Sequence, residues 1–166
     1  MNKLYIDTSA FFKTFVEEEA SDVVEPLILL AKEKKIEITL SDWLVNESVA
    51  LIDENRRKEK ITDIEVQNIL SELVSMMGNE VEYENFTVYP ITDKILIASR
   101  FAIEEYHINA SDALHVFISA VAECDCFISA DEKLIHQLTS GSSKLIAFNI
   151  RIKEDVKNLF NLLERS

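Results

Sequence analysis

The chain has 166 residues, enough for one hydrophobic core but short for two, so we expect a single domain over residues 1–166. Its residues are 48% hydrophobic and 28% charged, with two glycines and two prolines, which excludes disordered, collagen-like and linker-type chains. The formal net charge of −13 argues against a protein that coats DNA non-specifically, because it repels a polyanion at long range.

Strand-like and helix-like segments alternate along the chain. Short runs of β-branched and apolar residues predict the strands, and apolar residues at three- and four-residue spacing predict the helices. In chain order we expect a strand at 3–7, helices at 9–18 and 22–35, a strand at 36–40, helices at 42–58 and 62–78, a strand at 86–89, helices at 92–107 and 112–123, a strand at 124–129, a helix at 131–138, a strand at 144–148 and a helix at 153–163. This alternation predicts an α/β fold in which a parallel sheet lies between helical layers, a three-layer sandwich.

Local signals mark several helix starts. The segment 62–65 (TDIE) has the Ser/Thr-x-x-Glu form of a capping box. It predicts that the helix 62–78 forms a helical hairpin with the helix 42–58. Ser41 and Ser111 are placed to cap the helices that follow them.

Four acids are predicted to lie near one edge of the sheet. In open α/β sheets ligands bind at the carboxyl ends of the strands, and Asp7 closes the first strand while Asp131 follows the strand 124–129. Glu47 lies at the margin of the apolar face of its helix, where a carboxylate needs a partner. Asp112 opens the helix 112–123. Each aspartate alone also has a simpler explanation as a helix N-terminal or turn residue.

As a group, the four carboxylates would repel one another strongly unless protons or a cation neutralised them. Oxygen-only ligands suit Mg²⁺ or Mn²⁺ rather than zinc or copper. The sequence offers no competing centre, since it has no Gly-rich phosphate loop, no nucleophile elbow and no Cys/His pair in a recognisable register. Ser9 and Ser129 could hydrogen-bond the acids, and His115 could orient Asp112, although a surface or half-buried position is the more ordinary one for such a histidine.

The remaining signals concern location and local charge. No apolar run approaches the roughly 20 residues that span a bilayer, and the start of the chain lacks a signal-peptide pattern, so we expect a cytoplasmic protein without membrane association. Cys124 and Cys126 are too few for a disulfide framework or a four-ligand zinc site, and we expect buried thiols. The basic run 56–58 with Lys60 either forms a solvated helix end or supplies positive charge to a nucleic acid.

Five segments of the chain, in the order YIDTSAFFKTFVEEE, SDWLVNES, ASDALHVFISA, FISADEKL and KLIAF, carry a family resemblance. The chain from Tyr5 to about Phe148 resembles the PIN domains, in particular the VapC-type ribonuclease toxins. The resemblance implies a PIN-like fold and an Mg²⁺- or Mn²⁺-dependent endoribonuclease, the toxin of a type II toxin–antitoxin system. It also implies RNA as substrate, a cognate antitoxin and a homodimer. Metal-binding and catalytic roles are assigned by this resemblance to Asp7, Glu47, Asp112 and Asp131.

The chain departs from the family pattern in its acidity and in the segments 53–78 and after Phe148. The acidity implies that tight RNA binding needs a partner or a basic patch on another subunit. In the family, the helices of the segment 53–78 commonly contact an antitoxin or a second subunit. Here the simpler expectation is core packing of the apolar residues Ile61, Ile64, Ile69 and Leu73.

Three other interpretations assign the acids differently. A phospho-receiver-type signalling domain uses strand-end aspartates and Mg²⁺, but it normally has an adjacent acidic pair, and Thr8 follows Asp7 here. It also needs a lysine at the end of a late strand, which we do not find. A phosphatase of the Asp-x-Asp type would need an acid at Ser9. A PIN fold that binds without catalysis is the main alternative, and a cleavage assay separates it from an enzyme.

Overall fold

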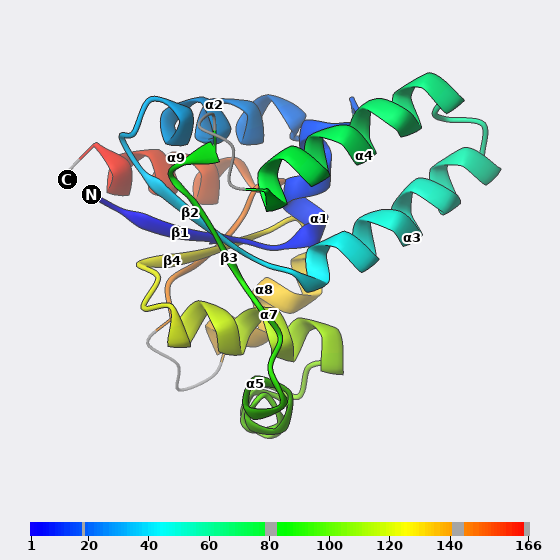
Figure 1. The fold of residues 1–166 in the computed structure, drawn as a ribbon. Helices are drawn as coiled ribbons and strands as arrows, with labels where there is room; N and C mark the ends of the chain where they lie inside the picture. Colours follow the sequence, from blue (N-terminus) through cyan, green and yellow to red (C-terminus); the bar gives the residue numbers. More distant parts are fainter. Residues whose placement is uncertain (18, 79–82, 141–144, 165–166) are drawn as a thin grey trace.

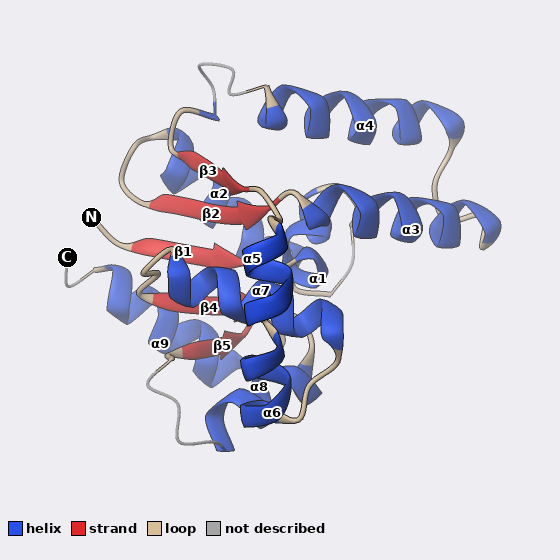
Figure 2. Ribbon diagram, turned by 60° about the horizontal axis from the view of Figure 1, so that its bottom comes forward, coloured by secondary structure: helices blue, strands red, loops and turns tan. Residues whose placement is uncertain are grey.

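Five parallel strands form one sheet at the centre of the molecule. The computed structural model describes residues 1–17, 19–78, 83–140 and 145–164. The strands are β1 (Lys3–Ile6), β2 (Glu37–Ser41), β3 (Phe86–Tyr89), β4 (Cys126–Ser129) and β5 (Ala147–Asn149). Their order in the sheet is β3-β2-β1-β4-β5, as Figure 2 shows. The predicted parallel sheet is therefore confirmed.

Residues alternate between the two faces of the sheet, because successive side chains of a strand point to opposite sides. Leu4 and Ile6 of β1 belong to one buried cluster, which also contains Ile128 of β4. Tyr5, between them, belongs to the second cluster together with Phe127. In register, Leu4 lies beside both Ile38 and Cys126, so β1 is covered on both edges as well as both faces.

Helices cover both faces and complete the three layers (Figure 1). The first cluster is closed by residues of α1 (Thr8–Phe11), α2 (Ser21–Lys32) and α9 (Lys153–Leu163). The second is closed by residues of α6 (Arg100–Tyr106), α7 (Ala110–Val121) and α8 (Glu132–Ser140), and α5 (Asp93–Ala98) packs outside α7. The predicted α/β three-layer arrangement, a parallel sheet between two layers of helices, is therefore confirmed (Figure 1).

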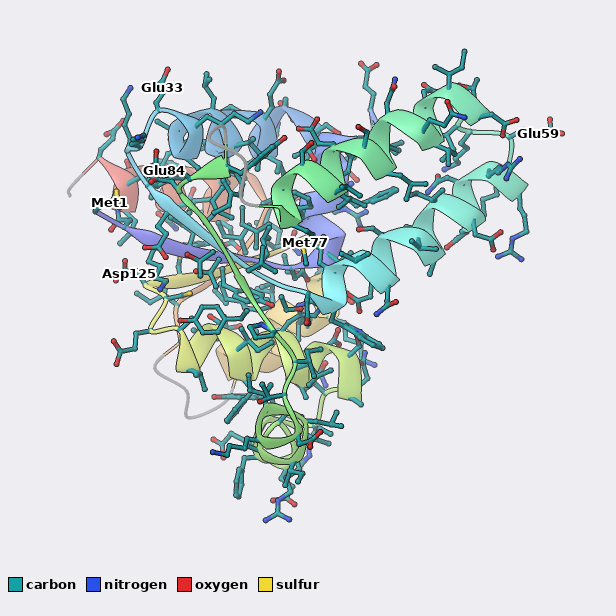
Figure 3. The ribbon with its side chains drawn as sticks, viewed as in Figure 1. Met1, Glu33, Glu59, Met77, Glu84 and Asp125 are labelled. Atoms are coloured by element: carbon teal, nitrogen blue, oxygen red, sulfur yellow. The ribbon has the colours of Figure 1, made fainter. Side chains whose placement is uncertain are left out.

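The helices α3 (Trp43–Arg57) and α4 (Asp63–Met77) form the predicted hairpin, which projects beyond the carboxyl edge of the sheet (Figure 1). The capping box at Thr62 and Glu65 is present at the start of α4. Figure 3 shows Glu59 at the far tip of the hairpin, at the opposite end of the molecule from Glu33 and Asp125. Three of the four apolar positions expected in the core are buried and the fourth, Ile64, is 71% exposed; the buried ones are Ile61, Ile69 and Leu73.

The predicted helix 9–18 is wrong in length, and its last residue, Glu18, lies outside the described residues. The chain forms the short α1 and then a 3-10 turn, η1 (Phe12–Thr14). A 3-10 turn aligns side chains three residues apart. Phe12 and Phe15 are spaced in this way, and their rings pack edge to face with centroids 6.1 Å apart. The tighter turn therefore places two aromatic rings against the same core.

The predicted helix 92–107 is two helices, α5 and α6, which meet at Ser99. The Ser99 hydroxyl donates a 2.9 Å hydrogen bond to the Leu96 carbonyl, a side-chain bond that competes with the helical ladder.

The predicted strands 124–129 and 144–148 are observed as the shorter β4 and the shifted β5; Lys144 lies outside the described residues. Within the described part of the chain, no helix combines the length and apolar character needed to cross a membrane.

Candidate active site

The four predicted acids line one open cleft of about 820 Å³ at the carboxyl edge of the sheet. Asp7 directly follows β1, and Asp131 lies between β4 and α8. Glu47 stands in the second turn of α3, which follows β2, and Asp112 stands in the first turn of α7. The topology thus brings together acids that are up to 124 positions apart in the sequence (7 to 131).

Asp7 is 5% exposed and is held by three donors. Its Oδ1 accepts the Ala10 N–H at 2.9 Å and the Ser9 hydroxyl at 2.8 Å, and its Oδ2 accepts the Ser129 hydroxyl at 2.6 Å. Asp7 is therefore both the N-cap of α1 and a cleft residue, and the two interpretations do not compete. Burial raises the pKa of the Asp7 carboxyl despite these hydrogen bonds and the nearby His115.

Glu47 is fixed by side chains from two other helices. The hydroxyls of Thr8 and Ser111 donate to its carboxylate, and His115 Nε2 lies 2.7 Å from Oε2. Burial by itself would raise the pKa of Glu47, but His115 and the two hydroxyls lower it to about 2. The expectation that this carboxylate needs a partner is confirmed.

Ser111 does not cap α7, which corrects the sequence prediction. Asn109 is the N-cap, and its side chain accepts the Asp112 N–H at 2.9 Å. Ser111 instead donates to Glu47 and accepts the Trp43 indole N–H at 2.9 Å. Because Asn109 caps the helix, the Ser111 hydroxyl can bind Glu47 in the cleft instead.

His115 is buried, with 3% of its surface exposed, so the expected surface or half-buried position is wrong. It hydrogen-bonds Glu47, and its Nδ1 lies 2.7 Å from the Tyr5 hydroxyl; no hydrogen bond to Asp112 is seen among the described residues. Burial acts to lower the pKa of His115, but the hydrogen bond and charge of Glu47 raise it overall. The histidine therefore belongs to Glu47 rather than to Asp112.

Asp112 shows the effect of repulsion that is expected of converging acids. Burial raises the pKa of Asp112 to about 6, and the charges of Asp131 and Asp7 add to this effect. Asn109 donates a 2.7 Å hydrogen bond to Asp112 Oδ2. Asp131 also accepts the Leu134 N–H at 3.0 Å, so the ordinary helix-start explanation holds for it as well.

Ser9 and Ser129 connect two of the strand ends, as expected for serines beside the acids. Their hydroxyl oxygens are 3.2 Å apart, and both donate to Asp7. Ser9 also accepts the Ala130 N–H at 3.0 Å, and Ser129 accepts the Asp131 N–H at 2.9 Å. The predicted role of these serines as partners of a carboxylate is confirmed for Asp7.

Cationic side chains surround the acids. Among the described residues, those lining the cleft are Lys13, Lys58, Lys60, Lys133 and Arg151. The basic run at the end of α3 divides in two. Arg56 and Arg57 pair with Asp63 and Asp53 as a solvated helix end, whereas Lys58, which pairs with Glu54, and Lys60 line the cleft. Among the described residues, the lining of the cleft therefore holds five cations beside six acids.

The donor set fits a hard cation in its chemistry. The converging groups are carboxylates and hydroxyls, which suit Mg²⁺ or Mn²⁺. Among the described residues, however, no three His, Cys, Asp or Glu side chains are grouped closely enough to form a ready-made metal cage. The carboxylates converge on a common cleft, and a bound cation would have to draw them together.

Comparisons with known proteins concern the fold. A scan against protein-family models found no match, and a search of curated proteins found none either. Among solved structures, the chain is similar to the one described as the crystal structure of PAE2754 from Pyrobaculum aerophilum, with a TM-score of 0.62 and 13% identity. The match covers 99% of this chain and 91% of that one. The similarity supports the mixed α/β architecture, and the chemistry has to be argued from the cleft itself.

Proposed function

We propose that this chain is an Mg²⁺- or Mn²⁺-dependent endoribonuclease with a PIN-like fold. The observation that carries the proposal is the convergence of Asp7, Glu47, Asp112 and Asp131 on one cleft at the carboxyl edge of a parallel sheet. Two further features support it. The pKa of Asp112 is raised to about 6 in part by the other acids, and the motif segments resemble those of VapC-type toxins. Clustered carboxylates of this kind call for a neutralising cation.

Asp7, Asp112 and Asp131 are the residues that would hold the cation. When bound, a divalent ion polarises the scissile phosphate and lowers the pKa of a water molecule. The hydrogen bonds from Ser9 and Ser129 fix the direction of the Asp7 carboxylate before any ligand arrives. This preorganisation reduces the ordering required when the substrate binds.

Glu47 has a different role in this proposal. With a pKa of about 2 it is a weak base at neutral pH, so it is poorly suited to removing a proton. As a fixed acceptor it can instead orient the attacking water and contribute negative charge to the cleft. The low pKa thereby argues against a base role for Glu47, and the proposal assigns it the water-positioning role.

The cations of the cleft would bind the phosphates of the RNA. Lys58 and Lys60 follow the end of α3, and Lys133 and Arg151 belong to the α8 and post-β5 segments. Phosphate contacts of this kind give most of the affinity of nucleic-acid binding. Their placement offsets the repulsion from a net charge of −13, so RNA binding is expected to be local and strongly salt-dependent.

A direct test is cleavage of single-stranded RNA by the purified protein in Mn²⁺, Mg²⁺ or EDTA. Cleavage is expected with the metals and is lost in EDTA and in Asp7→Asn. Asparagine caps helices about as well as aspartate, so this variant keeps the Ala10 contact while losing the charge. Asp93→Asn, an exposed acid in the first turn of α5, is the matched control. Undiminished turnover by Asp7→Asn would overturn the site assignment.

As part of the same proposal, the protein acts in the cytoplasm as the toxin of a type II pair, forms a homodimer and is neutralised by an antitoxin. Expression of the wild type should then slow cell growth, whereas Asp7→Asn should not. Equal growth of the two strains, with no cleavage in vitro, would favour the alternative of a PIN-fold binding module. Binding of RNA without turnover, measured by gel shift, is the positive signature of that alternative.

A further inference from the structure

A buried chain of polar side chains runs from the sheet to the cleft. Tyr5, in the middle of β1, is fully buried, and its hydroxyl lies 2.7 Å from His115 Nδ1. The other ring nitrogen of His115, Nε2, lies 2.7 Å from Glu47 Oε2. Tyr5 is itself fixed, because its ring stacks on Phe127 at 5.4 Å with an interplanar angle of 6°. The cleft carboxylate is thus connected to the rigid centre of the sheet.

The hydrogen-bonding roles in this chain follow from the groups themselves. A carboxylate only accepts, so His115 Nε2 carries the proton that it donates to Glu47. The other ring nitrogen, Nδ1, lies against the Tyr5 hydroxyl, which can accept from Nδ1–H when the ring is charged and donate to Nδ1 when it is neutral. Tyr5 therefore holds the ring of His115 from the side opposite to Glu47.

The hydrogen-bond donors around Glu47 leave one acceptor position of its carboxylate unoccupied among the described residues. An ionised carboxylate offers about four acceptor positions. Among the described residues, Oε2 receives Thr8 and His115 and Oε1 receives Ser111, which leaves one acceptor position on Oε1. The Glu47 side chain is 26% exposed and lines the cleft, so this position is available to a water molecule or substrate hydroxyl.

We propose that His115, with its ring held by Tyr5, is a positioning residue that holds Glu47 so that the remaining acceptor position on Oε1 faces the reacting water. This inference rests on the proposed ribonuclease function. His115 acts through Glu47 and does not itself touch substrate. Partners of this kind, one layer behind a functional group, typically change rates by about 10- to 100-fold when they are replaced.

If His115 only fills space in the core, its replacement has different effects from those expected of a positioning residue. Two variants with amide side chains distinguish the positioning role from the packing role. His115→Gln places an amide N–H near the position of Nε2, so it can still donate to Glu47. His115→Asn is too short to reach Glu47 and keeps its amide on the Tyr5 side. A positioning role predicts that Asn lowers kcat by about 10- to 100-fold with KM nearly unchanged, while Gln recovers most of the loss. A packing role predicts that the two variants are impaired to similar extents.

The decisive measurement is a cycle with Glu47→Gln. If His115 acts through Glu47, the double variant Glu47→Gln/His115→Asn cleaves RNA no more slowly than Glu47→Gln alone. Additive losses would overturn the inference. Thermal melts of every variant check that folded proteins are being compared. If His115→Asn is poorly folded, His115→Gln takes its place in the comparison.

A readout that needs no activity separates this inference from the proposed function. In ¹⁵N spectra of the histidine ring at neutral pH, the wild type should carry a slowly exchanging proton on Nε2, the nitrogen that faces Glu47. Absence of RNA cleavage by the wild type with either metal would overturn the proposed function and, with it, the catalytic purpose of His115. A wild-type ring protonated mainly on Nδ1 alone would overturn the positioning inference even if RNA is cleaved.

Discussion

Ser129 Oγ, at the end of β4, donates a 2.6 Å hydrogen bond to Asp7 Oδ2, at the end of β1. The same oxygen accepts the Asp131 N–H at 2.9 Å. One buried hydroxyl thus connects two neighbouring strands and two of the cleft acids. Because both partners of the bond are shielded from water, its loss leaves a carboxylate oxygen and a backbone N–H with one partner fewer.

Replacing this hydroxyl should destabilise the protein. Ser129→Ala is expected to lower the free energy of unfolding by about 1–3 kcal/mol, the range for a buried polar group that loses its partner. Urea denaturation measures the change. Ser140→Ala is the matched control, because its exposed hydroxyl donates to the His136 carbonyl within α8, and we expect a change within about 0.5 kcal/mol. Equal losses in the two variants would contradict the importance of the Ser129 contact.

The raised pKa of Asp112 makes stability depend on pH in a defined direction. The folded carboxyl has a pKa of about 6 against an ordinary value of 3.8, so the folded state binds more protons than the unfolded state between these values. This group's contribution to stability therefore falls as pH rises from about 4 to about 6. The full shift corresponds to about 3 kcal/mol, which solvent screening of a partly exposed group reduces to about 1 kcal/mol.

Asp112→Asn should remove this dependence. In EDTA the variant is expected to be more stable than the wild type by about 1 kcal/mol at pH 7 and equal to it near pH 4. Chemical denaturation at a series of pH values measures the difference in stability between the two proteins. A constant difference across the range would mean that Asp112 does not titrate as its surroundings imply.

Divalent metal should stabilise the fold through the same acids. A ligand that binds only the folded state at a hundred times its Kd adds about 2.7 kcal/mol. The wild type should therefore melt at a higher temperature in millimolar Mn²⁺ than in EDTA, and Asp112→Asn should gain less. Asp93→Asn, whose side chain does not line the cleft, should gain as much as the wild type. A wild-type transition that Mn²⁺ leaves unmoved would count against a metal centre.

The cleft lysines should set the salt dependence of RNA binding. Lys60→Glu is expected to weaken the binding of single-stranded RNA and to reduce the slope of log K against log salt by about one. The control is Lys35→Glu, which makes the same charge change at an exposed site that pairs with Glu33 and lies outside the cleft. Fluorescence anisotropy over 50–300 mM salt, taken as roughly the range where such effects are large, measures both variants. Similar slopes for the two variants would show that net charge, and not the cleft, governs binding.

Much of the acidic cluster could be predicted because its signals are local. Asp7 and Asp131 stand where an apolar strand gives way to a helix, and Glu47 interrupts the margin of an apolar helical face. Parallel strands then bring their carboxyl ends to one edge, so the topology follows from the alternation of elements. These steps need only patterns that lie within a few residues of one another.

The partners of Glu47 could not be predicted in the same way. Ser111 and His115 lie 64 and 68 positions from Glu47, and no local pattern indicates which carboxylate they face. Ser111 also resembled a helix cap, a role that Asn109 takes instead. The usable signal was a histidine on the apolar face of α7, where a buried polar ring needs partners on both nitrogens.

The place of β1 in the sheet has a consequence for how the molecule assembles. β1 pairs with β2, which directly follows α2 in the chain, but its other neighbour, β4, is made more than a hundred residues after β1, and the Ser129–Asp7 bond spans 122 positions. Closing so long a loop is entropically unfavourable until the contacts it permits are formed. A growing chain therefore holds Asp7 without its strand-end partner through most of its synthesis. The joining of β4 to β1 brings the segment of Asp131 beside that of Asp7 and so unites the acidic cluster late, before β5 adds to the edge of the sheet.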